Sequence, residues 1–173
     1  MDLRVSRAIV ASGWLGAVLM GLAPMVAHAQ FDAGIAVGTK APAVSIPDLD
    51  GKPVDLGGYF GKQVVVLEFW ATWCPICKSL MPQLEKVRQR FGDRVAILGV
   101  NITVNESKER VRRYLAQHRP PFLALYDEKG VSARAFEVPT TGFIVIVDAG
   151  GVVRYTGSGE DQDLVTEVAK VVK

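Results

Sequence analysis

Two cysteines three residues apart are the clearest chemical signal in the sequence. Cys74 and Cys77 enclose Pro75 and Ile76, and they follow a continuous apolar run that ends at Trp70. That run is typical of a buried strand, and the segment after it is typical of a helix. A thiol at a helix N-terminus is favoured as the nucleophilic thiolate, and the second thiol lies within reach to close a disulfide. The pattern therefore predicts a redox-active dithiol.

These are the only two cysteines of the chain, which argues against other uses of the pair. A structural zinc site needs four ligands, usually as two separated pairs, and covalent haem needs a histidine where Lys78 stands. A purely structural disulfide stabilises least when its loop is this short. Copper delivery stays open, because Met81 lies at helical spacing from Cys77 and soft sulfur ligands select Cu(I). We expect no cofactor and no resident metal.

The N-terminus has the features of an export signal. Arg4 and Arg7 precede an uncharged apolar stretch over residues 8–23, and Ala27-His28-Ala29 offers a small-x-small cleavage site. We predict a signal peptide over residues 1–29 and a mature domain over residues 30–173. The alternative is an uncleaved membrane anchor, because roughly 20 apolar residues span a bilayer. Both interpretations place the domain outside the cytoplasm, and we expect the periplasm, a compartment that keeps disulfides oxidised.

Length and charge bound the remaining possibilities. Removal of 29 residues from 173 leaves 144, the size of a single domain. The formal charge of the whole chain is +2, and its basic clusters are mixed with acidic residues, as on solvated helix faces. We expect a monomer that binds no nucleic acid.

Hydrophobic periodicity predicts alternating strands and helices. A hairpin is expected around Asp50-Gly51, followed by a central strand and a helix that Pro82 should kink. Asn105 is expected to cap the next helix, which runs to about Gln117. The predicted strands cover residues 64–69, 95–101, 122–125, 143–147 and 152–155, and the predicted helices cover residues 78–91, 105–117, 131–136 and 164–172. This order predicts an α/β fold.

Several motifs in this order resemble one family. They are the stretch Phe69–Cys77, Pro82, Val138-Pro139-Thr140, the turn Asp148–Gly151, and a lead-in with Pro42, Asp48 and Gly51. From about residue 35 to its end, the chain resembles the periplasmic thioredoxin-like thiol:disulfide oxidoreductases similar to TlpA, ResA and the DsbE-like cytochrome c maturation thioredoxins. The resemblance implies a thioredoxin fold, in which helices flank a central mixed β-sheet, with an N-terminal β-hairpin extension and one inserted helix-containing segment.

Glu68 is the one charged residue in the apolar strand before the cysteines. Burial of an isolated carboxylate is costly, so such a residue should have a raised pKa or a partner. The resemblance places it where thioredoxin carries a buried acid beneath the second cysteine, which implies that Glu68 moves a proton to and from Cys77. The alternative is a solvated side chain at the end of the strand.

The resemblance also assigns residues to substrate binding. It implies that Val138, Pro139 and Thr140 form the loop that pairs with an extended substrate, with a cis bond before the proline, although X–Pro bonds in general are mostly trans. Main-chain pairing of this kind tolerates varied substrate sequences. Trp73 is expected to flank the nucleophile as an exposed aromatic side chain.

The resemblance implies the reduction of disulfides in exported proteins, such as those of cytochrome c maturation or copper-site cysteines. A membrane thiol-electron donor of the DsbD or CcdA kind would then re-reduce the enzyme. Pro75 has no N–H to donate to a Cys74 thiolate, which favours a reductant. The alternatives are an oxidase of the same fold, a Cu(I)-binding assembly factor, a non-enzymatic binding module and a peroxidase. A peroxidase would need a Pro and a Thr at set positions before its cysteine, and in this sequence Glu68 and Ala71 stand near those positions.

Overall fold

A computed structural model describes residues 34–173 of the chain. The predicted signal peptide and its cleavage site lie outside the described residues. Within residues 34–173, no helix combines the length and the apolar character that a crossing of the bilayer requires.

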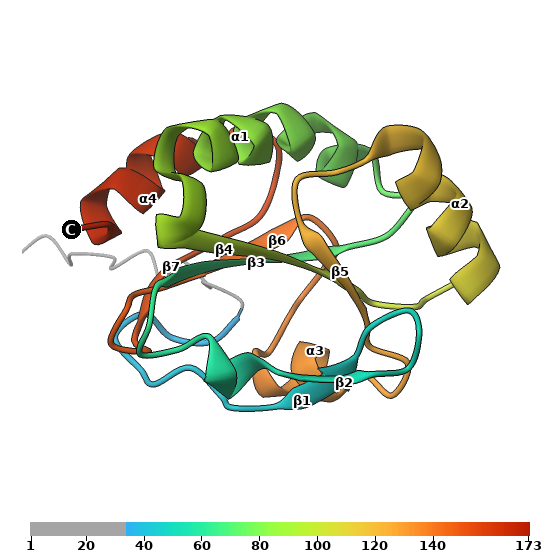
Figure 1. Cartoon of the computed structure of the whole chain (residues 1–173), viewed down its shortest axis with the longest axis horizontal. Coiled ribbons are helices and arrows are strands. Elements are labelled where there is room, and N and C mark those ends of the chain that lie inside the picture. Colours follow the sequence, from blue (N-terminus) through green and yellow to red (C-terminus); the bar gives the residue numbers. More distant parts are fainter. Residues whose placement is uncertain (1–33) are drawn as a thin grey trace, which may run out of the picture. The chain divides into compact units, whose positions relative to one another are not determined.

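A five-stranded mixed sheet forms the centre of the domain, in the strand order β5-β4-β3-β6-β7 (Figure 1). The strands are β3 (Val64–Trp70), β4 (Val95–Asn101), β5 (Leu123–Tyr126), β6 (Phe143–Val147) and β7 (Val153–Gly157). Strands β3, β4 and β5 run parallel, whereas β6 pairs antiparallel with both β3 and β7. The predicted mixed sheet is confirmed, with β3 at its middle.

Helices and a hairpin cover the two faces of this sheet (Figure 1). On one face lie α1 (Pro75–Phe91), α2 (Lys108–His118) and α4 (Leu164–Val171). On the other lie α3 (Val131–Ala135) and a two-stranded sheet of β1 (Ser45–Pro47) and β2 (Pro53–Asp55). The hairpin extension and the helix α2 between β4 and β5 lie where the sequence predicted them.

Strand β3 is buried along its whole length because both of its faces are covered. Val65, Leu67 and Phe69 join the core beneath the hairpin and α3. Val64 and Val66 point the other way and join the core beneath α1 and α4. The continuous apolar run of the sequence therefore reflects a central strand between two cores.

Two helix starts differ from the sequence prediction. Helix α1 begins at Pro75, three residues earlier than expected, because Cys74 is its N-cap and a proline is tolerated in the first turn. Asn105 does not cap α2, so that prediction is wrong. The cap is Ser107, whose Oγ accepts a hydrogen bond from the backbone N–H of Arg110 at 3.2 Å.

The N-terminal extension contacts both edges of the central sheet. Near one edge, Lys40 forms an isolated antiparallel bridge with Val152, just before β7. At the other edge, Asp48 forms such a bridge with Leu125 of β5. The extension therefore spans the sheet from one edge to the other.

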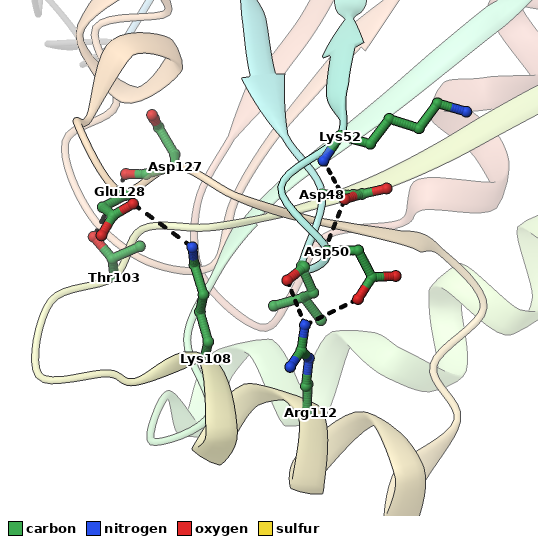
Figure 2. A network of polar contacts seen from close by, with 9 residues as sticks. Asp48, Asp50, Lys52, Thr103, Lys108, Arg112, Asp127 and Glu128 are labelled. Carbon is green, nitrogen blue, oxygen red and sulfur yellow. Dashed lines mark hydrogen bonds and ion pairs between the residues drawn. The ribbon is translucent and has the colours of Figure 1, made fainter.

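The tip of the hairpin is also tied to α2 (Figure 2). The Arg112 guanidinium donates to the backbone oxygen of Leu49 at 2.6 Å and to the Asp50 carboxylate at 2.9 Å. This ion pair is exposed and contributes little by itself. Its effect is positional, since it keeps Leu49 packed against the cluster that holds Trp70 and both cysteines.

Gly99 on β4 makes room for an aromatic contact beside the dithiol. A Cβ atom at Gly99 would lie 2.4 Å from the ring of Phe122, far inside van der Waals contact. That ring packs against Trp70, with a centroid distance of 5.2 Å. A side chain at position 99 would therefore displace Phe122 from Trp70.

We predict that Gly99→Ala lowers the free energy of unfolding by about 1–3 kcal/mol, the usual cost of overpacking a core. Urea unfolding of the oxidised protein measures the loss. Gly58→Ala is the control, because a Cβ atom there meets nothing within 4 Å. Equal stability of the two variants would contradict the prediction.

Candidate active site

Cys74 and Cys77 form a disulfide at the N-terminus of α1, with their Cα atoms 5.4 Å apart. The Cys74 sulfur accepts a hydrogen bond from the backbone N–H of Cys77 at 3.0 Å. The orphan N–H groups and the dipole of the helix are therefore directed at Cys74, as the sequence predicted. The structure represents the oxidised form of the dithiol.

Both sulfur-bearing side chains are nearly covered, with 1% exposure each, whereas Trp73 beside them is 43% exposed. Pro75 is exposed and Ile76 is half-buried. The predicted exposed aromatic neighbour is confirmed. Cys74 therefore lies between two exposed residues, Trp73 and Pro75.

Gly142 closes the site from the side of β6, and the sequence analysis missed it. A Cβ atom at Gly142 would lie 2.6 Å from Cγ2 of Ile76 and 3.9 Å from the Cys74 sulfur. Its φ of 74° is also in the left-handed region that favours glycine. Its N–H donates to the backbone oxygen of Phe69 at 2.8 Å, which fixes its position. Only a residue without a side chain allows this close approach to the dithiol.

Glu68 is completely buried in β3. Neither carboxylate oxygen has a hydrogen-bond partner among the described residues, and burial raises the pKa of Glu68 well above its ordinary value. The alternative of a solvated strand end is wrong. Its partners on the neighbouring strands are Gly99 and Ile144, which bring no compensating charge.

The alternation of β3 places Glu68 on the face covered by α1. Along this face it lies between Val66, which joins the α1 core, and Trp70, which joins the cluster of Cys74 and Cys77. A buried carboxyl group with a raised pKa therefore lies on the same side of the sheet as the dithiol.

Val138, Pro139 and Thr140 follow α3 and precede β6, as predicted, but the expected cis bond before Pro139 is absent. No peptide bond among residues 34–173 is cis. The trans form is the lower in energy by roughly 0.5–1 kcal/mol for an X–Pro bond. Here Glu137, with a φ of 52°, already redirects the chain after α3.

These three residues line a groove together with Ile102 and Val104 from the loop after β4. The Trp73 indole Nε1 donates to the backbone oxygen of Val104 at 2.8 Å. Trp73 is therefore linked by one hydrogen bond to a residue of the groove that Val138, Pro139 and Thr140 line.

Met81, which the sequence left open as a sulfur ligand for copper, is partly buried and packs against the core of α1 and α4. In the part of the chain that the structure describes, no three His, Cys, Asp or Glu side chains form a group suited to a metal ion.

A mixed sheet, a cysteine pair at the start of α1 and a buried acid in the preceding strand define a thioredoxin-fold thiol-disulfide oxidoreductase. The chain belongs to the Redoxin family, whose family model matches residues 36–172.

Comparisons with individual proteins agree with this family. The thioredoxin-like protein YneN of Bacillus subtilis is 35% identical over 130 residues, which cover 73% of this chain and 74% of YneN. The thiol-disulfide oxidoreductase ResA of Halalkalibacterium halodurans is 31% identical over 141 residues, which cover 79% of this chain and 77% of ResA.

Solved structures share the fold. A putative thiol:disulfide interchange protein DsbE from Chlorobium tepidum has a TM-score of 0.71 and 24% identity, and the match covers 80% of this chain and 99% of that one. Together with the disulfide of Cys74 and Cys77, these likenesses make the chain a thiol-disulfide oxidoreductase of the ResA and DsbE type.

The burial of Glu68 predicts a stability that depends on pH. Below about pH 4.3, Glu68 is protonated in both the folded and the unfolded states. Above that value the unfolded state loses the proton while the folded state keeps it, so the wild type becomes less stable as the pH rises toward the raised pKa.

We therefore expect the stability of Glu68→Gln relative to the wild type to increase as the pH rises above about 4.3, where the unfolded wild type loses the proton that the folded state keeps. Denaturant unfolding of the oxidised proteins at several pH values measures this difference. Glu85→Gln, an exposed position on α1, serves as the control and should show no such trend. A pH-independent difference for Glu68→Gln would refute the expectation.

Proposed function

We propose that this protein reduces disulfides in exported proteins of the periplasm through Cys74 and Cys77. The observation that supports this direction is the sparse stabilisation of a Cys74 thiolate. Among the described residues, the backbone N–H of Cys77 is the donor to the Cys74 sulfur, and Pro75 has no N–H to add. A thiolate with few donors is less stable, which leaves the reduced enzyme with a greater tendency to pass on its electrons.

The location belongs to the same proposal. Residues 1–29 would act as the signal peptide, or as an anchor if they are not cleaved, and residues 30–173 would form the thioredoxin-like domain. The apolar stretch over residues 8–23 and the Ala27-His28-Ala29 site support export.

The reaction would proceed by two thiol–disulfide exchanges. The Cys74 thiolate attacks one sulfur of the substrate disulfide, that S–S bond breaks, and the leaving thiolate takes a proton. Cys77 then loses its proton and attacks Cys74. The mixed disulfide breaks, and the second substrate sulfur leaves as a thiol. Two electrons pass to the substrate, and Cys74–Cys77 becomes the disulfide that the structure contains.

Glu68 would accept the proton of Cys77 in the second exchange and return it when the enzyme is re-reduced. Its burial without a partner supports this role, because a carboxyl group with a raised pKa is matched to proton transfer near neutral pH. The position of Glu68 on the face of β3 that α1 covers supports proton exchange with Cys77 of α1 rather than with solvent.

Trp73, Val138, Pro139 and Thr140 would hold the substrate as an extended segment in their groove. Pro139 and Thr140 are exposed and Val138 is half-buried, which leaves the backbone of this loop accessible. Pro75 and Ile76 separate the cysteines and set how readily the disulfide forms. Contact through the main chain would accept varied sequences, such as apocytochrome c or the cysteines of copper sites.

A reductant in an oxidising compartment needs a supply of electrons. A membrane thiol-electron donor of the DsbD or CcdA kind would attack the Cys74–Cys77 disulfide with its own dithiol and become oxidised in turn. No cofactor takes part in these exchanges, and a monomer suffices for them.

The reduction potential tests the direction of the reaction. We expect a value near that of thioredoxin, about −270 mV, after equilibration of the purified protein with glutathione or dithiothreitol buffers. A value near that of DsbA, about −120 mV, would favour the oxidase. Cys74→Ser and Cys77→Ser are the controls, because neither variant can close the disulfide. Tight Cu(I) binding that competes with exchange in the wild type would favour the assembly factor.

The proposed role of Glu68 predicts a change in the kinetics of the second exchange. In single-turnover reduction of a peptide disulfide, Glu68→Gln should slow this step at least about tenfold near pH 7, because general base catalysis is typically worth 10²-fold or more. The mixed disulfide should accumulate, and it should accumulate fully in Cys77→Ser, which lacks the second thiol. Glu85→Gln should behave as the wild type, and superimposable pH profiles for Glu68→Gln and the wild type would remove Glu68 from the mechanism.

A further inference from the structure

Two hydrogen bonds join the loop after β4 to the residues just before Cys74. The Glu106 carboxylate Oε1 accepts a hydrogen bond from the backbone N–H of Thr72 at 2.5 Å. The backbone oxygen of Val104 accepts the indole N–H of Trp73 at 2.8 Å. The two residues that precede the nucleophile are therefore both held by one loop, residues 102–107.

That loop is fixed from its other side (Figure 2). Thr103 has a φ of 58°, and its hydroxyl donates to the backbone oxygen of Asp127 at 3.5 Å. Just past the loop, the Lys108 ammonium lies 3.7 Å from the Glu128 carboxylate. These two contacts attach the loop to the segment after β5, and they restrict the position of Glu106.

The second oxygen of Glu106 is buried and has no hydrogen-bond partner among the described residues. No ion pair within 4.0 Å involves Glu106 in that part of the chain either. A hydrogen bond to a backbone N–H needs only one neutral acceptor, which an amide would supply equally well. An unpaired, partly buried carboxylate therefore calls for a role in which its charge matters.

The Glu106 carboxylate lies close to residues of the active site. The backbone N–H that Glu106 accepts belongs to Thr72, two residues before Cys74, so the carboxylate lies beside the loop that carries the nucleophile. Its field also reaches Tyr126, whose pKa is raised by burial and by the charges of Glu128, Glu106 and Glu109. Tyr126 packs in the same cluster as Cys74 and Cys77.

Other charged groups surround the same place. Lys78, Arg110, Arg113 and His118 line the hollow beside Thr72, and Glu68 lies beneath in β3. Lys78, Arg110 and Arg113 are exposed, so water screens their charges more than it screens the buried oxygen of Glu106. The N-terminus of α1 stabilises a Cys74 thiolate, whereas a negative charge on Glu106 destabilises it.

We propose that Glu106 is a positioning residue that holds Thr72 in place through its backbone N–H and whose negative charge disfavours the Cys74 thiolate, so that the dithiol stays strongly reducing. The inference deepens the reductant function proposed above and rests on it for its biological meaning. The charge effect itself does not depend on the direction of the physiological reaction.

Glu106→Gln separates the charge from the hydrogen bond, because the amide oxygen can still accept the Thr72 N–H. We expect the pKa of the Cys74 thiol to fall in Glu106→Gln, measured by thiolate absorbance of the reduced protein. We also expect the equilibrium constant with glutathione to shift toward the reduced enzyme by about tenfold, equal to about 30 mV toward a more oxidising potential.

Glu109→Gln is the matched control, since Glu109 is an exposed acid three residues further along in the first turn of α2. Because water screens the exposed charge of Glu109, Glu109→Gln should change both quantities much less than Glu106→Gln does. Glu106→Asp keeps the charge and should stay closer to the wild type than Glu106→Gln. If Glu106→Gln keeps the wild-type pKa of the Cys74 thiol and the wild-type reduction potential, the charge has no role and the inference is overturned.

The two proposals fail separately. An oxidising potential in the wild type would overturn the reductant function, while a shift between wild type and Glu106→Gln would still support the effect of the charge. A reducing wild type with an unshifted Glu106→Gln would overturn only the role of Glu106.

Discussion

The junction between β3 and α1 is the constraint on which the rest of the structure depends. Strand β3 is buried between two cores, and the chain turns directly from it into a helix whose first cap is the Cys74 sulfur. The cap, the nucleophile and one end of the disulfide are therefore the same atom. Any change that moves the strand relative to the helix also changes the chemistry, which is why Gly99 and Gly142, both close-packed positions near this junction, matter to function as well as to stability.

Two carboxylates lie near this junction on different sides. Glu68 lies in the sheet, fully buried and without a partner among the described residues, whereas Glu106 accepts a hydrogen bond from the loop that precedes Cys74. In the proposals above, Glu68 exchanges a proton with Cys77, and the charge of Glu106 disfavours the Cys74 thiolate. The two roles would act at different steps, because the two sulfurs ionise at different steps of one reaction.

Features that depend on residues close together in the chain were predictable from the sequence, whereas contacts between distant residues were not. The cysteine pair and the burial of Glu68 were predictable because strand, turn and helix are adjacent in the chain. The cap of α2 was misplaced because Asn105 and Ser107 are both good capping residues two positions apart, and only the tertiary structure chooses between them. The contact of Glu106 with Thr72 joins residues 34 positions apart, and no local pattern encodes it.

The N-terminal extension touches the sheet near β7 through Lys40 and at β5 through Asp48. An exposed sheet edge is a template on which any extended chain can add a strand, which makes it a site of aggregation. With backbone pairing already occupied at points on both edges, an extended chain finds fewer unpaired N–H and C=O groups to pair with. The extension therefore protects the sheet from strand addition at these points.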